Sequence, residues 1–370
     1  MSLSIAIVGL PNVGKSTLFN ALTDSDILAA NYPFATIEPN TGIVPVPDNR
    51  LKELAGLYQS RKVTPATVTF VDVAGLVAGA SQGEGLGNQF LANIRTANAI
   101  CHVVRAFADR NVIHVNPAAD DGDRVDDIPD PKKDIDVINT ELILADLQTV
   151  QKRLPKTEKE AKANPKLKPL LETQQRILEL LDAGTPLSAA TDIDMEHIGD
   201  LQLLTAKPVI YVFNVDEATL QDETRKSELQ RLVAPAQAIF ICAKLEHELQ
   251  GLDEADAAEL LESYGQHEPG LNQLVHAAYD TLGLQSYLTA GPDEARAWTI
   301  AAGATAPQAA GVIHGDFERG FIAAEVVDYD DLTRAGTMQA AKAAGKVRTE
   351  GKTYVMKPGD IVEFRFNVSK

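Results

Sequence analysis

Short apolar runs alternate with longer polar and amphipathic segments along this chain, which is the pattern of an α/β fold. Unbroken apolar runs rich in β-branched residues are typical of parallel strands that are buried on both faces. Apolar residues at helical spacing follow the first run, at 17–22. We therefore predict a mainly parallel sheet packed between helices. Its strands are expected at 3–8, 67–75, 99–106, 208–214 and 238–243.

About a hundred residues separate the third and fourth of these runs, far more than a crossover helix needs. This segment opens with the acidic loop 120–136 and then shows two long helical patterns, at 135–154 and 167–183. A lysine-rich stretch with Pro155 and Pro165 separates the two patterns. We predict an antiparallel helical hairpin inserted into the sheet domain.

The pattern changes again after residue 283. Strand-like runs lie at 287–300 and 320–327, and 361–366 alternates with a period of two, as a half-buried strand does. Residues 352–360 are predicted to form a strand followed by a turn. This part of the chain is therefore expected to be a small mixed β domain.

Composition narrows the range of functions. A length of 370 residues predicts two or three domains. No apolar run is long enough to span a bilayer and no charged-then-apolar leader opens the chain, so we expect no membrane association. The two cysteines, Cys101 and Cys242, lie in strand-like runs and are expected to be core residues of a cytoplasmic protein.

Charge is unevenly distributed. A net charge of −18 argues against bulk electrostatic binding of nucleic acid. Two segments have the opposite balance: residues 151–176 hold eight basic and three acidic side chains, and residues 342–370 hold seven and three. Most charge runs are solvated faces, but these two basic islands are also candidate contacts for rRNA.

The segment from Gly9 to Ser16 reads G-x-x-x-x-G-K-S and lies between the first predicted strand and the first predicted helix. This is the context that a phosphate-binding loop requires. Its backbone N–H groups and the helix N-terminus would hold phosphates, Lys15 would reach the outer phosphates, and Ser16 would bind Mg²⁺. The candidate phosphate-binding residues are Asn12, Val13, Gly14, Lys15, Ser16 and Thr17.

Two further segments occupy the positions of magnesium and γ-phosphate contacts. The loop 31–40 follows the first helix, and Thr36 is its candidate metal ligand. Asp72 opens a D-x-x-G pattern, in which an aspartate holds Mg²⁺ and the backbone N–H of Gly75 can contact the γ-phosphate. The glycine-rich stretch 79–88 is expected to respond to the nucleotide.

Base recognition is predicted just after the fourth strand. Ras-like GTPases read guanine there with N-K-x-D, whereas this chain has Asn214-Val215-Asp216-Glu217. A site without the guanine-binding pair loses much of its discrimination for GTP, and backbone groups near Val215 can serve adenine. We predict that ATP is preferred over GTP. The alternative is that the segment shifts by one residue, so that Asp216 binds guanine. Ala243, after the fifth strand, is a further candidate nucleotide contact.

Ras-like enzymes place a glutamine after D-x-x-G to orient the attacking water. Leu76 stands there and cannot bond water, so either hydrolysis is slow or another group positions the water. His114 is the candidate, with a structural surface histidine as an equal alternative, whereas His102 lies mid-strand and is expected in the core. With Lys15 and Gly75, His114 completes the candidate catalytic set.

Together these motifs resemble the YchF / Obg-like ATPase family of translation-factor-class P-loop NTPases, and the resemblance runs essentially end to end. It is carried by G-L-P-N-V-G-K-S-T-L-F-N-A-L (9–22), N-Y-P-F-A-T-I-E-P-N (31–40), D-V-A-G-L (72–76), G-E-G-L-G-N-Q-F-L (83–91), N-V-D-E (214–217) and R-A-W-T-I (296–300). It implies a Ras-like, OBG-type G domain at 1–130 and 203–283, an inserted helical (coiled-coil) domain at 131–202, and a C-terminal TGS domain of β-grasp shape at 284–368.

The resemblance also implies an activity. Family members hydrolyse ATP with N-x-x-E in place of N-K-x-D, which Asn214 and Glu217 match, and with a hydrophobic residue in place of the glutamine, which Leu76 matches. The family's proposed catalytic histidine falls on His114. Members bind ribosomes, chiefly the 50S subunit, and are linked to stress and redox responses. The expected cofactor is Mg²⁺, with K⁺ as an additional candidate.

Three functions are therefore compatible with the sequence. The first is an ATP-hydrolysing switch on the ribosome, in which ATP and Mg²⁺ order the loop of Thr36 and the stretch 79–88. The second is a nucleotide-gated module that binds protein or RNA and turns over incidentally, which Leu76 favours. The third, an Obg-like GTPase, is disfavoured by Glu217. Turnover stimulated by ribosomes distinguishes the first from the second.

Overall fold

A computed structural model describes residues 3–23, 40–73, 86–108, 129–190, 193–194 and 198–367. These residues divide into two compact units. The first contains most of the chain up to residue 277, and the second combines residues 43–68 with 278–367. Strands β2 (Thr41–Pro45) and β4 (Thr67–Asp72) carry the chain from the first unit to the second and back.

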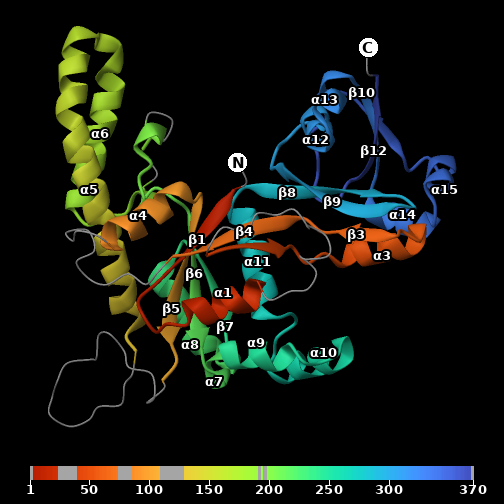
Figure 1. The fold of residues 1–370 in the computed structure, drawn as a ribbon, viewed down its shortest axis with the longest axis horizontal. Coiled ribbons are helices and arrows are strands. Elements are labelled where there is room, and N and C mark those ends of the chain that lie inside the picture. Colours follow the sequence, from red (N-terminus) through yellow and green to blue (C-terminus); the bar gives the residue numbers. More distant parts are fainter. Residues whose placement is uncertain are drawn as a thin grey trace. The chain divides into compact units, whose positions relative to one another are not determined.

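The first unit is built on the predicted parallel sheet (Figure 1). Its strands lie in the order β2-β4-β1-β5-β6-β7, and every pair from β4 to β7 is parallel. Seven of the eight residues of β5 are buried, as expected of a parallel strand covered on both faces. The strands not yet delimited are β1 (Ser4–Val8), β5 (Ala99–Ala106), β6 (Val209–Val215) and β7 (Gln237–Ile241).

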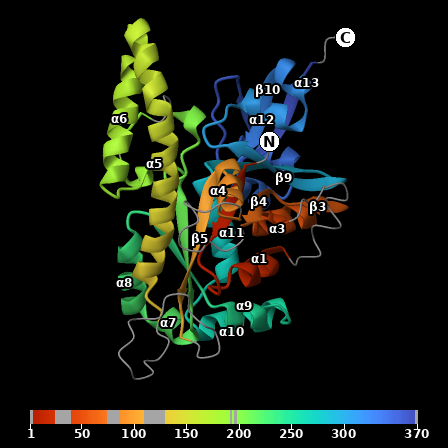
Figure 2. The same ribbon diagram turned by 60° about the vertical axis from the view of Figure 1, so that its left-hand side comes forward.

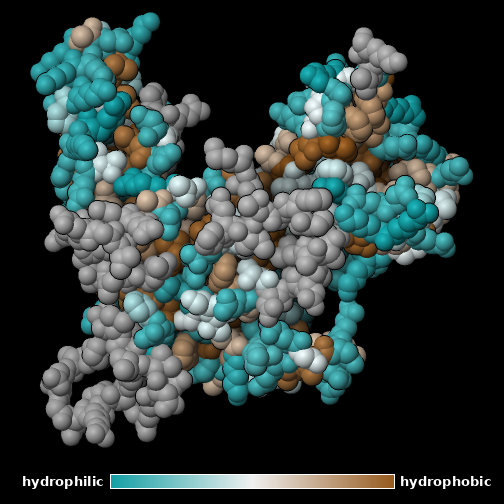
Figure 3. Space-filling model, viewed as in Figure 1, coloured by the Kyte–Doolittle hydropathy of each residue, from teal (hydrophilic) through white to brown (hydrophobic). Residues whose placement is uncertain are grey.

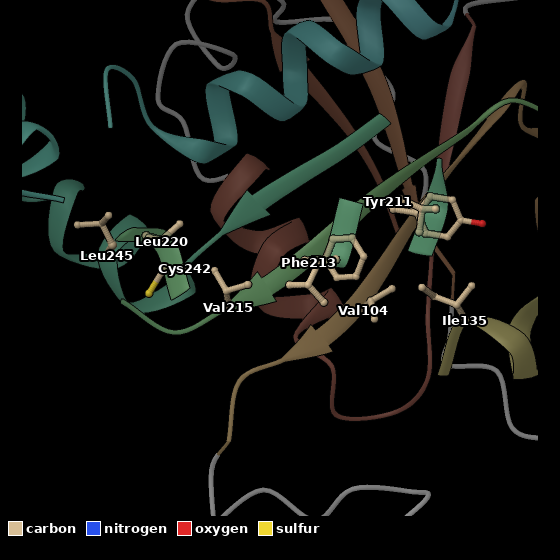
Figure 4. Packing of buried hydrophobic residues seen from close by; sticks show 10 residues of the cluster. Val104, Ile135, Tyr211, Phe213, Val215, Leu220, Cys242 and Leu245 are labelled. Atoms are coloured by element: carbon tan, nitrogen blue, oxygen red, sulfur yellow. The ribbon is translucent and has the colours of Figure 1, made fainter. Parts of the chain in front are cut away.

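Helices of this unit follow the strands they connect, and a buried cluster joins them to the sheet (Figure 4). Phe213 and Val215 of β6 pack with Leu245 of α9, and Val104 of β5 and Ile135 of α5 belong to the same cluster. This packing positions the end of β6, which carries the predicted base-binding segment. The helices are α1 (Lys15–Thr23), α4 (Leu86–Thr96), α7 (Glu217–Gln221), α8 (Glu223–Val233), α9 (Ala243–Leu249), α10 (Glu254–Ser263) and α11 (Gly270–Thr281).

The predicted helical hairpin is present (Figure 2). It consists of α5 (Pro131–Ala163) and α6 (Lys168–Asp182), joined by a short 3₁₀ turn at Pro165–Leu167. In contrast to the expectation from sequence, Pro155 lies inside α5 and does not separate the helices. An interior proline costs a helix about 3 kcal/mol, and packing of α5 against α6 outweighs this cost. Neither α5 nor any other described helix has an apolar stretch that could cross a membrane.

A buried carboxylate attaches the hairpin to the sheet. Asp146 of α5 is fully buried and accepts hydrogen bonds from the backbone N–H groups of Leu204 and Thr205, at 2.9 and 2.8 Å, and from the Thr205 hydroxyl at 2.8 Å. Burial raises the pKa of Asp146, and these three hydrogen bonds oppose the rise. The segment that enters β6 is therefore held directly against α5.

The second unit contains a mixed sheet in the order β11-β10-β12-β8-β9-β3. The central pair β12–β8 is parallel, and its neighbours β10 and β9 run antiparallel to it, which is the strand arrangement of a β-grasp fold. Tyr287 of β8 is buried and donates to the Ala309 carbonyl of α12 at 3.0 Å, so it joins the sheet to this helix. The strands are β3 (Lys62–Thr64), β8 (Leu284–Ala290), β9 (Glu294–Ala301), β10 (Phe321–Val327), β11 (Arg348–Glu350) and β12 (Ile361–Phe366).

Two features of this unit differ from the sequence pattern. Residues 352–358 form no strand beyond a single bridge between Val355 and Thr305, because Pro358 lacks an N–H donor and the Asp360 carboxylate accepts the Lys357 N–H in a local turn. The unit also holds more helix than expected. Its helices are α3 (Asn49–Tyr58), α12 (Ala306–Ile313), α13 (Gly315–Arg319), α14 (Tyr329–Ala335) and α15 (Met338–Ala343).

Candidate nucleotide-binding site

The loop between β1 and α1 has a backbone that only glycine can adopt at two positions. Gly9 has φ +156° and Gly14 has φ +100°. A Cβ atom at Gly9 would lie 2.5 Å from the carbonyl oxygen of Val103, and one at Gly14 would lie 2.6 Å from Nδ2 of Asn214. The loop therefore packs directly on β5 and β6, and it leads into α1 with the N-terminal N–H groups of the helix available for an anion.

Lys15 is the first residue of α1, directly after this loop. Its side chain is buried, and its ammonium group donates to the carbonyl oxygen of Leu10 at 2.7 Å. Burial lowers the pKa of Lys15, while the nearby carboxylate of Asp72 opposes this shift. A buried cation that is bonded to the loop itself is suited to receive the charge of a bound phosphate.

Ser16 and Asp72 come together as a candidate magnesium site. Asp72 ends β4, in register with Ile7 of β1. Burial raises the pKa of Asp72, whereas Lys15 and a hydrogen bond with Ser16 lower it. Oδ1 of Asp72 is buried and has no hydrogen-bond partner among the described residues. A carboxylate oxygen left in this state beside a serine hydroxyl fits Mg²⁺, which prefers such oxygen ligands.

The end of β6 is tied to the same loop. The amide of Asn214 donates to the carbonyl oxygen of Val13 at 3.1 Å. Val215 is buried. Asp216 caps α7, since its carboxylate accepts the Thr219 N–H at 2.9 Å. The one-residue shift that would present Asp216 to guanine is therefore opposed by the role of its side chain in starting this helix.

Glu217 is the first residue of α7, and Ala243 is the first of α9. The Glu217 carboxylate forms an ion pair with Lys244, with 2.6 Å between Oε1 and Nζ. This hydrogen bond raises the pKa of Lys244. Because β6 and β7 are parallel neighbours, both groups lie at the sheet edge that carries the phosphate-binding loop.

A small cavity of about 30 Å³ lies next to these residues. Gly14, Thr17, Asn214 and Ala243 contribute to its lining, and so does Glu246 of α9. The Glu246 carboxylate is buried and accepts the N–H of Gly270 at 2.7 Å, at the start of α11. Burial raises the pKa of Glu246 to about 7, against the effect of its hydrogen bonds to backbone N–H groups.

The structure thus brings most of the predicted site residues to one edge of the sheet. Those that it places there are Asn12, Val13, Gly14, Lys15, Ser16, Thr17, Asp72, Asn214, Val215, Glu217 and Ala243. Thr36, Gly75 and His114 lie outside the described residues. His102 of β5 is buried against Tyr211 of β6, and burial lowers the pKa of His102 to about 3. It is therefore the core residue that the pattern predicted. Both cysteines are also buried, as expected.

Sequence reasoning missed Lys244 and Glu246. The position of Lys244, directly after the candidate Ala243, was a usable signal, but its partner depends on which strands are neighbours. Glu246 carries no local signal, because a glutamate in the first turn of a helix is usually solvated. Only the packing of α11 against α9 shows that it is buried.

Comparison with known proteins identifies the family. Residues 4–121 match a family model described as "50S ribosome-binding GTPase", and residues 284–367 match the YchF-GTPase_C model, described as "Protein of unknown function (DUF933)". A curated relative from Bacillus subtilis is 47% identical over 376 residues and covers all of both chains. One from Haemophilus ducreyi is 48% identical over 373 residues, again with full coverage. Both are named ribosome-binding ATPase YchF.

The chain belongs to the YchF family. The solved structure of the Schizosaccharomyces pombe YchF GTPase agrees, with a TM-score of 0.83, 38% identity and 98% coverage of each chain. The resemblance inferred from the motifs is thus confirmed, and so is the fold class of a Ras-like P-loop domain with an inserted helical hairpin and a C-terminal β-grasp domain. YchF proteins are named after different nucleotides: the two bacterial relatives are named ATPases and the yeast protein a GTPase.

Proposed function

We propose that this chain is a cytoplasmic, Mg²⁺-dependent ATPase that acts as a nucleotide switch on the ribosome. The observation that carries the proposal is the cradle formed by the loop 9–16 with Asp72, whose Oδ1 is buried and without a partner among the described residues. Mg²⁺, when bound, neutralises charge on the β- and γ-phosphates. Ser16, Thr36 and Asp72 would hold it, and Lys15 would contact the outer phosphates.

The preference for ATP over GTP is supported by the replacement of the guanine-reading aspartate by a glutamate that is already ion-paired. Glu217 stands where GTPases have aspartate and is paired with Lys244, and Asp216 caps α7. A site whose acceptors are already engaged pairs poorly with the two donors of guanine. These contacts also disfavour the alternative of an Obg-like GTPase.

Hydrolysis is proposed to depend on His114, which would position water in place of the glutamine that Leu76 replaces. The backbone N–H of Gly75 would contact the γ-phosphate, and the segments around Thr36 and 79–88 would order with it. We keep K⁺ as an additional candidate cation. We also propose that three domains act as functional units: the G domain at 1–130 and 203–283, the inserted helical domain at 131–202, and the C-terminal domain at 284–368.

Ribosome binding is proposed from the names of the relatives, and the 50S subunit from the description of the matching family model. The two basic islands are not equally suited to rRNA. In the C-terminal island the basic side chains are largely used within the unit: Lys346 pairs with Asp331 at 3.5 Å and Arg348 with Asp328 at 2.9 Å, and Lys342 and Arg365 both contact Glu325.

The hairpin island is different. Lys152, Lys156, Lys159 and Lys162 are exposed on α5, at spacings of four, three and three residues, which place them along one side of the helix. Among the described residues, only Lys156 of these four makes an ion pair, with Glu160 at 3.8 Å. The surface over the hairpin is largely hydrophilic (Figure 3). We call these four lysines the α5 stripe and propose it as the phosphate-backbone contact.

The ATPase rate with and without 50S subunits tests this function. We expect the subunits to increase the rate, and His114→Ala to abolish the increase while nucleotide binding is retained. Unchanged turnover of His114→Ala would remove this residue from the mechanism. Ribosome binding that ignores the nucleotide, without stimulation, would instead support the second function, a binding module with the slow turnover that Leu76 favours.

A further inference from the structure

The ion pair between Glu217 and Lys244 lies where α7 and α9 begin, just after β6 and β7 and beside the candidate base-binding residues Asn214 and Ala243. Asn214 of β6 is in register with Ile241 of β7, so the residues that follow the two strands emerge side by side. The Glu217 side chain is 34% exposed and that of Lys244 is 70% exposed. Lys244 also approaches Glu248, but at 4.0 Å, compared with 2.6 Å to Glu217.

The two purines make opposite demands on a carboxylate at this position. Guanine presents two donors, its ring N1–H and its N2 amino group, and both oxygens of a free carboxylate are needed to accept them. Adenine presents an unprotonated N1, which repels a free carboxylate. An ammonium group bound to one carboxylate oxygen leaves only the other oxygen free to accept from guanine. It also neutralises the charge of the carboxylate and offers an N–H donor to N1 of adenine.

We propose that Lys244 is a specificity-determining residue for the base: its ion pair with Glu217 withholds the carboxylate from guanine and makes this edge of the site acceptable to adenine. The inference rests on the proposed ATP site, but it assigns the selectivity to a residue outside the N-x-x-E motif. No other carboxylate of the segment replaces Glu217, because Asp216 is bound to the Thr219 N–H.

Lys244→Met tests the inference, since methionine retains much of the length of the side chain but not the charge. Loss of a cation weakens binding of both triphosphates, so the readout is the ratio of dissociation constants for GTP and ATP, measured with their slowly hydrolysed imido analogues and Mg²⁺. We expect this ratio to fall by about fivefold, the range of an exposed ion pair. Lys346→Met, which removes an ion-paired lysine from the second unit, is the matched control and should leave the ratio unchanged.

Two additional arms identify the group responsible. Inosine triphosphate lacks the N2 amino group, so Lys244→Met should improve its binding relative to ATP less than it improves that of GTP. In a Glu217→Gln background, Lys244→Met should no longer change the ratio, because the carboxylate it would release is absent. Lys244→Arg keeps the pair and should keep the selectivity.

The outcomes separate the inference from the proposed function. If the unmodified chain binds the GTP analogue tenfold more tightly than the ATP analogue, the proposed ATP preference is wrong. If Lys244→Met changes both affinities by the same factor, or acts equally with and without the Glu217 carboxylate, Lys244 contributes only general charge and the inference is overturned.

Discussion

At the scale of single residues, three ionisable groups near the predicted nucleotide, Lys15, Asp72 and Glu246, are shifted by burial. Lys15 and Asp72 are each shifted by burial toward their neutral forms and each partly restored by the other. Among the residues that the structure describes, Glu246 has no such charged partner, and backbone N–H groups of α11 stabilise its charged form. A bound nucleotide and its metal would supply charge to the first pair, whereas Glu246 is expected to affect the stability of the fold.

Glu246 should make stability depend on pH. Its pKa is raised from 4.5 to about 7 in the folded chain, so the folded state retains the proton that the unfolded state loses between these values. Proton binding at Glu246 therefore stabilises the fold fully below about pH 4.5, and this stabilisation is lost as the pH rises through 7. The free energy of unfolding falls by at most ~3 kcal/mol over this range. Denaturant unfolding of wild type and Glu246→Gln from pH 5 to 8 measures it.

The free energy of unfolding of wild type should fall relative to that of Glu246→Gln as the pH rises. Glutamine keeps an acceptor for the Gly270 N–H but does not titrate, so the variant lacks this pH dependence. Glu262→Gln, an exposed site on α10, should show no such trend. Parallel pH profiles of wild type and Glu246→Gln would show that Glu246 does not titrate in this range.

At the scale of elements, the contrast between the two basic islands is the feature that the structure adds to the sequence. Lys152→Gln with Lys159→Gln removes two charges of the α5 stripe that form no ion pair with any described residue, whereas Lys342→Gln with Lys346→Gln removes two charges that are ion-paired. We expect only the first pair to weaken binding to an rRNA duplex and to reduce the slope of log Kd against log salt, by about two. Fluorescence titration across a KCl series measures both. Equal effects of the two double variants would contradict the proposed role of the stripe.

Elements whose pattern is local could be predicted from the sequence. The unit β1–loop–α1 can be predicted from an apolar run, from Gly9 and Gly14 at positions with positive φ, and from apolar residues at helical spacing. All three signals lie within about twenty residues. The run at 352–358 looked equally strand-like, but a local turn around Asp360 leaves it only one bridge, to Thr305. Pro155 fails as a helix boundary for a different reason, because α5 packs against α6 and continues past this residue to Ala163.

At the scale of the whole chain, the sequence does not indicate that residues 43–68 join the C-terminal part. They do so through long-range contacts, such as the parallel pairing of β3 with β9 and the hydrogen bond of Tyr329 with Glu53. The Glu217–Lys244 pair has the same origin, since it requires β6 and β7 to be neighbours. Residues that follow one strand can be assigned from a motif, but pairs across two strands require the topology.

The proposed switch, its base selectivity and its hydrolysis all require a triphosphate and Mg²⁺ to bind at the loop 9–16. The most direct measurement is a calorimetric titration of the full chain and its Lys15→Ala variant with a slowly hydrolysed ATP analogue, with and without Mg²⁺. We predict saturable binding that Mg²⁺ strengthens and that Lys15→Ala weakens by about tenfold or more, the loss of a charge-assisted contact. Binding of equal strength by the two proteins, or none by the unmodified chain, would contradict the account.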